Sequence, residues 1–122
     1  MNKFEYKKLL IDSSARGVFP SATSTGYCQY RGDNGRKCAV GLILPDEIFN
    51  VVDECGDANS LIETCEAGGL SLSWIPEGIT PDDLQIIQGI HDDAVVKMRN
   101  NNCKIWPHDE FVGEIESLEC FK

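Results

Sequence analysis

Hydrophobic and polar positions recur with helical periodicity most clearly in the last third of the chain. A helix is predicted to begin after Thr80 as N-cap, with Pro81 in the first helical position. Asp82 and Asp83 follow at the positive end of the helix dipole. From there to about residue 99, one stripe recurs at three- and four-residue spacing, and it is apolar except for one histidine: Leu84, Ile87, His91, Ala94, Val95 and Met98.

The same reasoning predicts an amphipathic helix at each end of the chain. Residues 3–16 place four charged side chains on one narrow stripe, and Gly17 stops the helix. That stripe consists of Glu5, Lys8, Asp12 and Arg16. A last helix is predicted from about His108 to Cys120, with Phe111, Ile115 and Leu118 on its inner face.

Two shorter helices are predicted in the middle of the chain. Pro45, followed by two acidic residues, is a helix start, and this helix is expected to run to about Cys55. A second one is expected from Leu61 to Ala67, capped by residues 57–60 and stopped by Gly68 and Gly69. Residues 18–26 and 70–79 are predicted to be connectors, the latter with a buried Trp74 and Ile75.

Strand signals occur in one place only. Residues 27–31 and 36–40 are β-prone and flank a turn that contains Asn34 and Gly35, a dipeptide that favours β-turns. A hairpin is therefore predicted, with Cys28 and Cys38 near one another, although the sequence leaves its register open. The expected fold is a mostly helical α+β single domain over residues 1–122, with one β-hairpin at about residues 27–40 packed on helices.

The charge of the chain is unevenly distributed. Its net charge is −9, yet residues 1–40 carry seven basic and three acidic side chains. Residues 41–96 carry twelve acidic side chains and no Lys or Arg. This distribution argues against direct nucleic-acid binding, which needs a basic surface. It favours an acidic surface that solvates the protein, binds a basic partner or imitates a phosphate backbone.

The six cysteines are interpreted with the cellular compartment in mind. The N-terminus lacks the apolar block of a signal peptide, and no apolar run is long enough to span a membrane. We therefore expect a soluble cytoplasmic protein, in which cysteines are mostly small buried hydrophobic residues. The oligomeric state is not predicted.

His91 is the most informative single residue, because it interrupts an apolar stripe. The simplest interpretation is a buried neutral histidine with hydrogen-bonded ring nitrogens. One alternative is zinc bound by Cys28, Cys38 and His91, with His108 or Cys103 as fourth ligand, although no local chelating motif is present. Another is a nucleophilic thiolate at Cys28 or Cys38, with His91 as its base. The nearby Arg31, Arg36 and Lys37 would lower the pKa of that thiol. Asp92 is a poor orienter there, because adjacent helical residues point about 100° apart.

The remaining candidates are surface residues. The predicted hairpin tip carries Arg31, Arg36 and Lys37, which could hold an anion or an acidic partner. We take the binding candidates to be Tyr30, Arg31, Arg36, Lys37, Asp46, Glu47, Asp82 and Asp83. A second group is either structural or functional: Cys28, Cys38, Gln88, His91 and Asp92.

Together these residues resemble a family of small proteins of unassigned function from phages, prophages and proteobacteria, with the pattern CxYRGxxGxKCAVGxLIPDE followed by a QxxHD helix. The chain departs from it at Ile43 and Leu44, where the family has Leu-Ile. The matching residues are Cys28, Tyr30, Arg31, Gly32, Gly35, Lys37, Cys38, Ala39, Val40, Gly41, Leu42, Pro45, Asp46, Glu47, Gln88, His91 and Asp92. The resemblance implies a phage-type accessory protein and no particular chemistry.

We therefore expect a non-enzymatic protein that binds a host or phage protein, for example as an inhibitor of a host defence or nucleic-acid-processing protein. No cofactor, bound metal or catalytic residue is expected. The alternative is a cysteine/histidine enzyme or zinc protein that uses Cys28, Cys38 and His91.

Overall fold

The computed structural model describes residues 1–21, 29–50, 58–100 and 105–122. In those ranges the chain forms five α-helices and two short 3₁₀ helices. In chain order these are α1 (Lys3–Ala15), η1 (Asp33–Gly35), α2 (Asp46–Phe49), α3 (Ala58–Ala67), α4 (Pro81–Asn100), α5 (His108–Glu116) and η2 (Glu119–Phe121).

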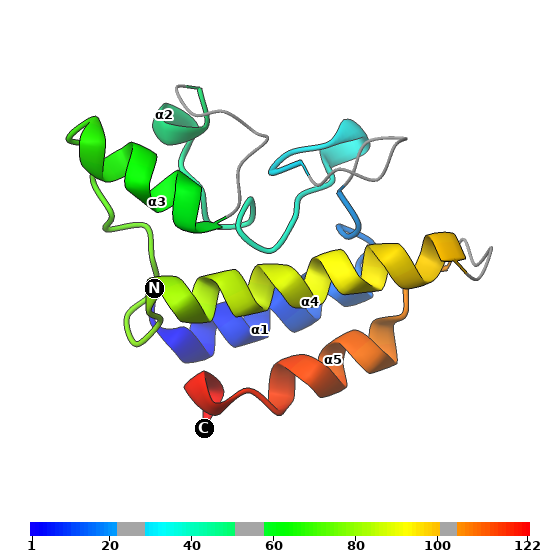
Figure 1. Cartoon of the computed structure of the whole chain (residues 1–122). Helices are drawn as coiled ribbons and strands as arrows, with labels where there is room; N and C mark the ends of the chain where they lie inside the picture. Colours follow the sequence, from blue (N-terminus) through cyan, green and yellow to red (C-terminus); the bar gives the residue numbers. More distant parts are fainter. Residues whose placement is uncertain (22–28, 51–57, 101–104) are drawn as a thin grey trace.

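Helix α4 is the central element of the fold. It packs against α3 on one side and against α5 on the other, and α5 also packs against α1. In Figure 1, α4 runs across the middle of the molecule with α1 behind it and α5 below, while α2 and α3 lie above. Both termini lie at the same end, where the Lys3 ammonium donates to the carbonyl of Lys122 at 3.4 Å.

The helix starts follow their capping signals. Thr80 and Asp83 form a reciprocal cap at α4: the Asp83 N–H donates to Thr80 Oγ1 at 3.1 Å, and the Thr80 N–H donates to Asp83 Oδ2 at 3.0 Å. Asn2 and Glu5 form the equivalent capping box at α1. Gly17, just beyond α1, has φ of 76°, a conformation that glycine adopts without strain. The predicted helix over residues 3–16 and the α4 helix are confirmed.

The middle helices differ in extent from the prediction. Helix α3 begins at Ala58, three residues earlier than Leu61, and ends before Gly68 as predicted. Helix α2 has Pro45 as N-cap instead of first helical residue. The predicted end of that helix near Cys55 lies outside the described residues. Helix α5 ends at Glu116 and is followed by η2, so the predicted continuous helix to Cys120 is wrong.

The predicted β-hairpin at about residues 27–40 is wrong, and so is the α+β fold class. Over the described residues the chain is all-helical, and its β pairing consists of isolated bridges, Asn2 with Glu77 and Arg31 with Lys37. The turn is nevertheless where the sequence placed it, because Asn34 and Gly35 adopt positive φ values of 60° and 76°. The Gly32 N–H donates to the Arg36 carbonyl across it at 2.8 Å.

The Cys38 N–H still donates to the Tyr30 carbonyl across this turn at 3.3 Å, but a strand ladder does not extend further because the neighbouring backbone groups bond elsewhere. The Lys37 N–H donates to the carbonyl of Val18 at 3.2 Å. The Val40 N–H donates to a side chain of α4. Past Cys38 the chain coils into further turns, with the Leu42 N–H donating to the Cys38 carbonyl at 3.1 Å. Tertiary partners have replaced the strand partners that a hairpin would supply.

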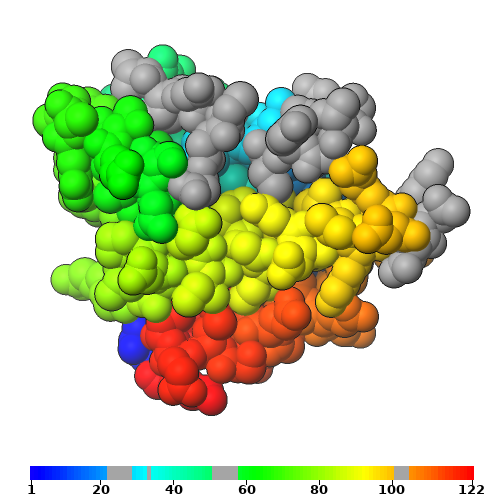
Figure 2. Space-filling view, viewed as in Figure 1, coloured from blue at the N-terminus to red at the C-terminus, as the bar shows by residue number. Residues whose placement is uncertain are grey.

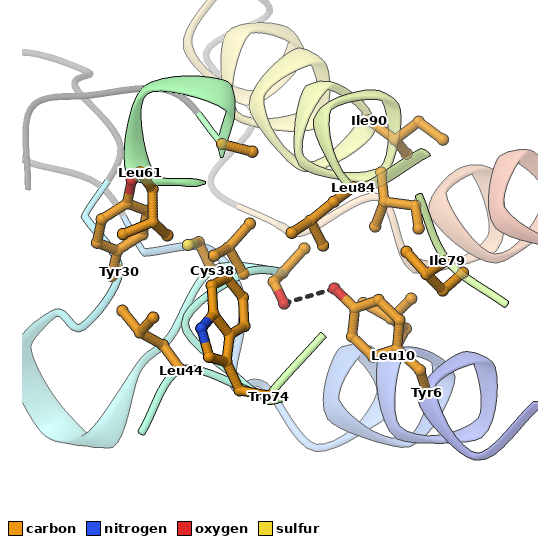
Figure 3. Close-up of a cluster of buried hydrophobic side chains, with 14 of the residues drawn as sticks. Tyr6, Leu10, Tyr30, Cys38, Leu44, Leu61, Trp74, Ile79, Leu84 and Ile90 are labelled. Carbon is orange, nitrogen blue, oxygen red and sulfur yellow. Dashed lines mark hydrogen bonds between the residues drawn. The ribbon is translucent and has the colours of Figure 1, made fainter. Parts of the chain in front are cut away.

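The hydrophobic core joins this irregular segment to the helices. In Figure 3, Tyr30, Cys38, Leu44 and Leu61 gather around Trp74, while Tyr6 and Leu10 of α1 approach from the other side. The Tyr6 hydroxyl donates to the buried carbonyl of Ala39 at 2.7 Å, which is the dashed line in the figure. Trp74 is buried as predicted, whereas Ile75 is only partly buried.

No helix in the described ranges is both long and apolar enough to cross a membrane.

Candidate functional site

Gln88 of α4 links that helix to the irregular segment. Its Oε1 accepts a hydrogen bond from the Val40 N–H at 3.0 Å, and its Nε2 donates to Asp92 Oδ1 at 2.9 Å. Both Gln88 and Val40 are buried. A buried backbone N–H without an acceptor is costly, so Gln88 supplies what a neighbouring strand would otherwise provide.

His91 lies one turn further along α4 and is completely buried. Its Nε2 lies 3.2 Å from the backbone N–H of Ser21. An N–H can only donate, so Nε2 is the acceptor and the ring proton is on Nδ1, which donates to Asp92 Oδ1 at 3.0 Å. The ring is therefore neutral, and its contact with Asp92 is a hydrogen bond. The Gln88 amide nitrogen, 3.5 Å from Nδ1, faces another donor and bonds to Asp92 instead.

The prediction of a buried, satisfied histidine is confirmed. The ring also lies in an aromatic cluster, edge-on to Phe19 at 5.5 Å between centroids and tilted to Trp106 at 5.6 Å. Phe111 completes the cluster at 5.2 Å from Phe19. His91 thus joins residues 19–21 to α4, and the aromatic cluster extends this contact through Phe19 and Trp106 to Phe111 of α5.

The expectation that Asp92 points away from His91 is wrong. Its Oδ1 accepts from both Gln88 and His91. Gln88 is four residues earlier and therefore on the same side of the helix as Asp92, and the His91 ring turns its Nδ1 toward that side. The carboxylate receives two hydrogen bonds while its side chain remains 43% exposed.

Cys38 does not have the environment of a nucleophile. The pKa of its thiol is raised to about 12, mainly by burial and to a smaller extent by the Asp92 carboxylate, against the lowering effect of nearby backbone N–H groups. The Gly41 N–H donates to Cys38 Sγ at 3.3 Å. The predicted lowering of this pKa by Arg31, Arg36 and Lys37 is therefore not found. A protonated, buried thiol packs as a small apolar side chain.

The zinc hypothesis finds no support in the part of the chain that is described. Within those ranges no three or more His, Cys, Asp or Glu side chains are arranged to hold a metal ion. Two of the proposed zinc ligands, Cys28 and Cys103, lie outside the described residues. The alternative in which Cys28 is the nucleophile therefore also lies outside them. His108 is used otherwise: its Nδ1 lies 2.6 Å from Ser14 Oγ, which accepts from Trp106 Nε1 at 2.8 Å.

Several residues of the segment from Tyr30 to Asp46 make intramolecular contacts. Tyr30 is buried, and Gly41 lies so close to it that an added Cβ would be 1.8 Å from the Tyr30 carbonyl oxygen. Arg31 donates to the Leu44 carbonyl at 3.1 Å, pairs with Asp46 at 2.5 Å and lies over the Phe49 ring. These contacts fix the path from the turn to α2.

The predicted binding candidates therefore differ in accessibility. Arg36 is exposed and its guanidinium lies 3.4 Å from the carbonyls of Phe19 and Pro20, while Lys37 is partly buried. Glu47 and Asp82 are exposed. Asp46 is exposed but paired with Arg31, and Asp83 caps α4. The candidates do not form one patch: the basic ones and Asp46 surround the turn, whereas Asp82 and Asp83 begin α4.

Helices α3, α4 and α5 lie side by side across one face of the molecule in Figure 2, and we call the exposed side of these three helices the acidic surface. Exposed acids occur on each of these helices, including Glu66, Asp93 and Glu114. At the edge between α4 and α5, Lys97 pairs with Glu110 at 3.1 Å. The Glu110 hydrogen bond and the negative charges of Glu110, Glu114 and Asp93 raise the Lys97 pKa. The charges of three carboxylates thus act on one ammonium, so negative charge is in excess there.

Sequence reasoning missed the outward side of α4. Ile86 and Val96 are 52% and 50% exposed, and Gly89 lies between them with nothing within 4 Å of an added Cβ. The signal was present as a second series of positions at three- and four-residue spacing, offset from the buried stripe.

Comparisons with protein-family models, curated proteins and solved structures give no match to this chain.

Proposed function

We propose that this chain is a non-enzymatic binding protein that contacts a protein partner through the acidic surface of α3, α4 and α5. The observation that carries the proposal is the excess of carboxylates on this surface, with Lys97 already neutralised by Glu110. Helix α1, with three lysines against two acidic residues, lies behind α4. The exposed basic residues of α3, α4 and α5 are Lys97 and Arg99, so the surface keeps a large excess of negative charge. Such an excess favours encounter with a partner of opposite charge.

The resemblance to a phage and prophage family supports a role as a small accessory protein in the host cytoplasm. The partner is then a host or phage protein with a basic surface. Defence and nucleic-acid-processing proteins are of this kind, because they need basic surfaces to bind phosphate backbones. An acidic protein that occupies such a surface acts as an inhibitor.

The geometry around Cys38 and His91 supports the non-enzymatic part of the proposal. The thiol is held protonated, and Nε2 of His91, which would have to accept a proton as general base, already accepts the Ser21 N–H. Both side chains are buried in contacts that stabilise the fold.

The test is capture of partners from bacterial lysate by the immobilised protein, followed by quantitative mass spectrometry. Glu66→Lys, Asp93→Lys and Glu114→Lys each reverse one exposed charge of the acidic surface. Asp12→Lys is the matched control, because it makes the same charge change at an exposed position of α1. We expect a protein that wild type and Asp12→Lys retain, and that the three other variants retain at least fivefold less. Equal capture by all four variants would reject the proposal.

A further inference from the structure

The outward side of α4 carries a stripe that no other described element covers. Its apolar members are Ile86 and Val96, each about half exposed, and its acidic members are Asp82 and Asp93. Gly89 lies at the centre, where the absence of a side chain leaves the helix backbone open. Figure 2 shows α4 at the surface between α3 and α5.

The positions of the stripe alternate at spacings of four and three residues: Asp82, Ile86, Gly89, Asp93, Val96 and Asn100. That average spacing is the one at which a helix meets a second helix crossing at a shallow angle. Over 18 residues it extends about 27 Å along the axis, five turns of helix. A glycine at its centre admits a large side chain from the facing helix.

The charge around the stripe specifies what can approach it. Asp82 and Asp93 lie within it, and Glu114 of α5 lies close enough to Lys97 to act on the same ammonium as Asp93. The one nearby lysine is paired with Glu110, and Arg99, the other exposed basic residue of α4, is not a member of the stripe. A facing helix must therefore bring Lys or Arg to the carboxylates as well as apolar side chains to Ile86 and Val96.

We infer that α4 is a docking site for a basic amphipathic helix of the partner, with apolar residues against Ile86 and Val96 and a large side chain over Gly89. This rests on the proposed function and specifies the class of partner segment. A second copy of this chain is a poorer occupant, because each copy has a net charge of −9 and would bring its own acidic stripe to the contact.

The probe is a synthetic 21-residue helical peptide with Leu at heptad a and d positions and Lys at the flanking positions. Two control peptides replace either every Leu by Ser or every Lys by Glu. Binding is measured by fluorescence anisotropy, and its location by amide chemical-shift changes in the full chain. We expect the first peptide to bind at least tenfold more tightly than both controls, with the largest shifts within residues 82–100.

Variants then separate the apolar contribution from charge. Ile86→Ser/Val96→Ser and Gly89→Leu leave the net charge unchanged, and leucine at position 89 meets no neighbouring atom at its Cβ. Each is expected to weaken peptide binding at least tenfold. Ile105→Ser, at another exposed isoleucine outside the stripe, is expected to change it less than twofold.

Three results would overturn the inference. These are equal binding of the Leu→Ser peptide, largest shifts outside α4, or self-association of the chain at micromolar concentration that Gly89→Leu abolishes. The same apolar variants applied to lysate capture separate the two proposals. If Asp93→Lys loses a partner that Ile86→Ser/Val96→Ser keeps, the acidic surface binds that partner, but the inference that α4 docks an amphipathic helix is wrong.

Discussion

The Gln88 side chain accepts the backbone N–H of Val40, 48 residues earlier in the chain, at 3.0 Å in the protein interior. This hydrogen bond attaches the irregular segment around Val40 to α4. Without it, the Val40 N–H would need an acceptor from a neighbouring strand. The same amide donates to Asp92, which also accepts from His91. The pattern residues of α4 thus hold the turn segment in place.

Gln88→Ala should therefore lower the free energy of unfolding by about 1–3 kcal/mol, because it leaves the buried Val40 N–H without an acceptor. Gln85→Ala is the control on the same helix, since Gln85 Oε1 accepts the Asn59 N–H at 3.2 Å at an exposed site. It should cost less than about 1 kcal/mol. Urea unfolding measures both, and equal losses would show that the Gln88 contact has no special weight.

Gly41→Ala should be more damaging, with a loss of about 3 kcal/mol or more. The new Cβ would lie 1.8 Å from the Tyr30 carbonyl oxygen and 2.7 Å from its carbon, both backbone atoms that cannot rotate away. Gly113→Ala in α5 is the control, because its Cβ meets nothing within 4 Å and alanine favours helix by about 1 kcal/mol. Thermal unfolding should move in opposite directions for the two variants. A tolerated Gly41→Ala would refute the close packing of this segment on Tyr30.

His91→Ala should lower the free energy of unfolding by about 1–3 kcal/mol, because the Ser21 N–H loses its acceptor. His108→Ala removes a partly buried ring bonded to Ser14 and should cost about 1 kcal/mol or less. Chemical unfolding gives both values. Capture of the partner by folded His91→Ala should equal that of wild type, and a specific loss of capture would assign His91 to function instead.

The raised pKa of the Cys38 thiol leads us to predict that the free energy of unfolding depends on pH. Its pKa is raised from 9.0 to about 12 in the folded state, so the folded chain keeps a proton that the unfolded chain releases. The stabilisation is complete below pH 9 and declines as the pH rises toward 12. Burial also raises the pKa of Tyr6, which adds to the decline at higher pH.

Comparison with Cys38→Ala isolates the thiol contribution. Between pH 7 and 10.5, wild type should lose about 2 kcal/mol more than this variant, whatever their difference at pH 7. Urea unfolding at a series of pH values provides the measurement. Parallel curves for the two proteins would show that Cys38 ionises normally and is accessible to base.

Local signals in the sequence were sufficient for helices α1 and α4 and for the position of the turn. Thr80, Pro81 and the two following aspartates place the start of α4, and Asn34 with Gly35 places the turn. Whether the residues beside that turn pair as strands depends on Gln88 and Val18, which are distant in sequence. Local propensity carries no information about such partners, and the hairpin prediction failed for this reason.

The candidate site was predictable to a similar extent. The position of His91 in an apolar stripe indicated burial and hydrogen bonding, which the structure confirms. The direction of the Asp92 side chain depends on its rotamer and on Gln88, so the ideal helical angle alone was misleading. The link from Ser14 to Trp106 and His108 joins residues more than 90 positions apart and had no signal in the local pattern.

The most direct test of the central claim is photo-crosslinking in bacterial cells that express the chain with p-benzoylphenylalanine at single exposed positions. Positions 66 and 93 sample the acidic surface, and position 8 samples α1 behind it. We predict that one cellular protein crosslinks at 66 and 93 and not at 8. Crosslinks to that protein from position 8 alone, or none from either acidic helix, would contradict the assignment of the acidic surface as the binding site.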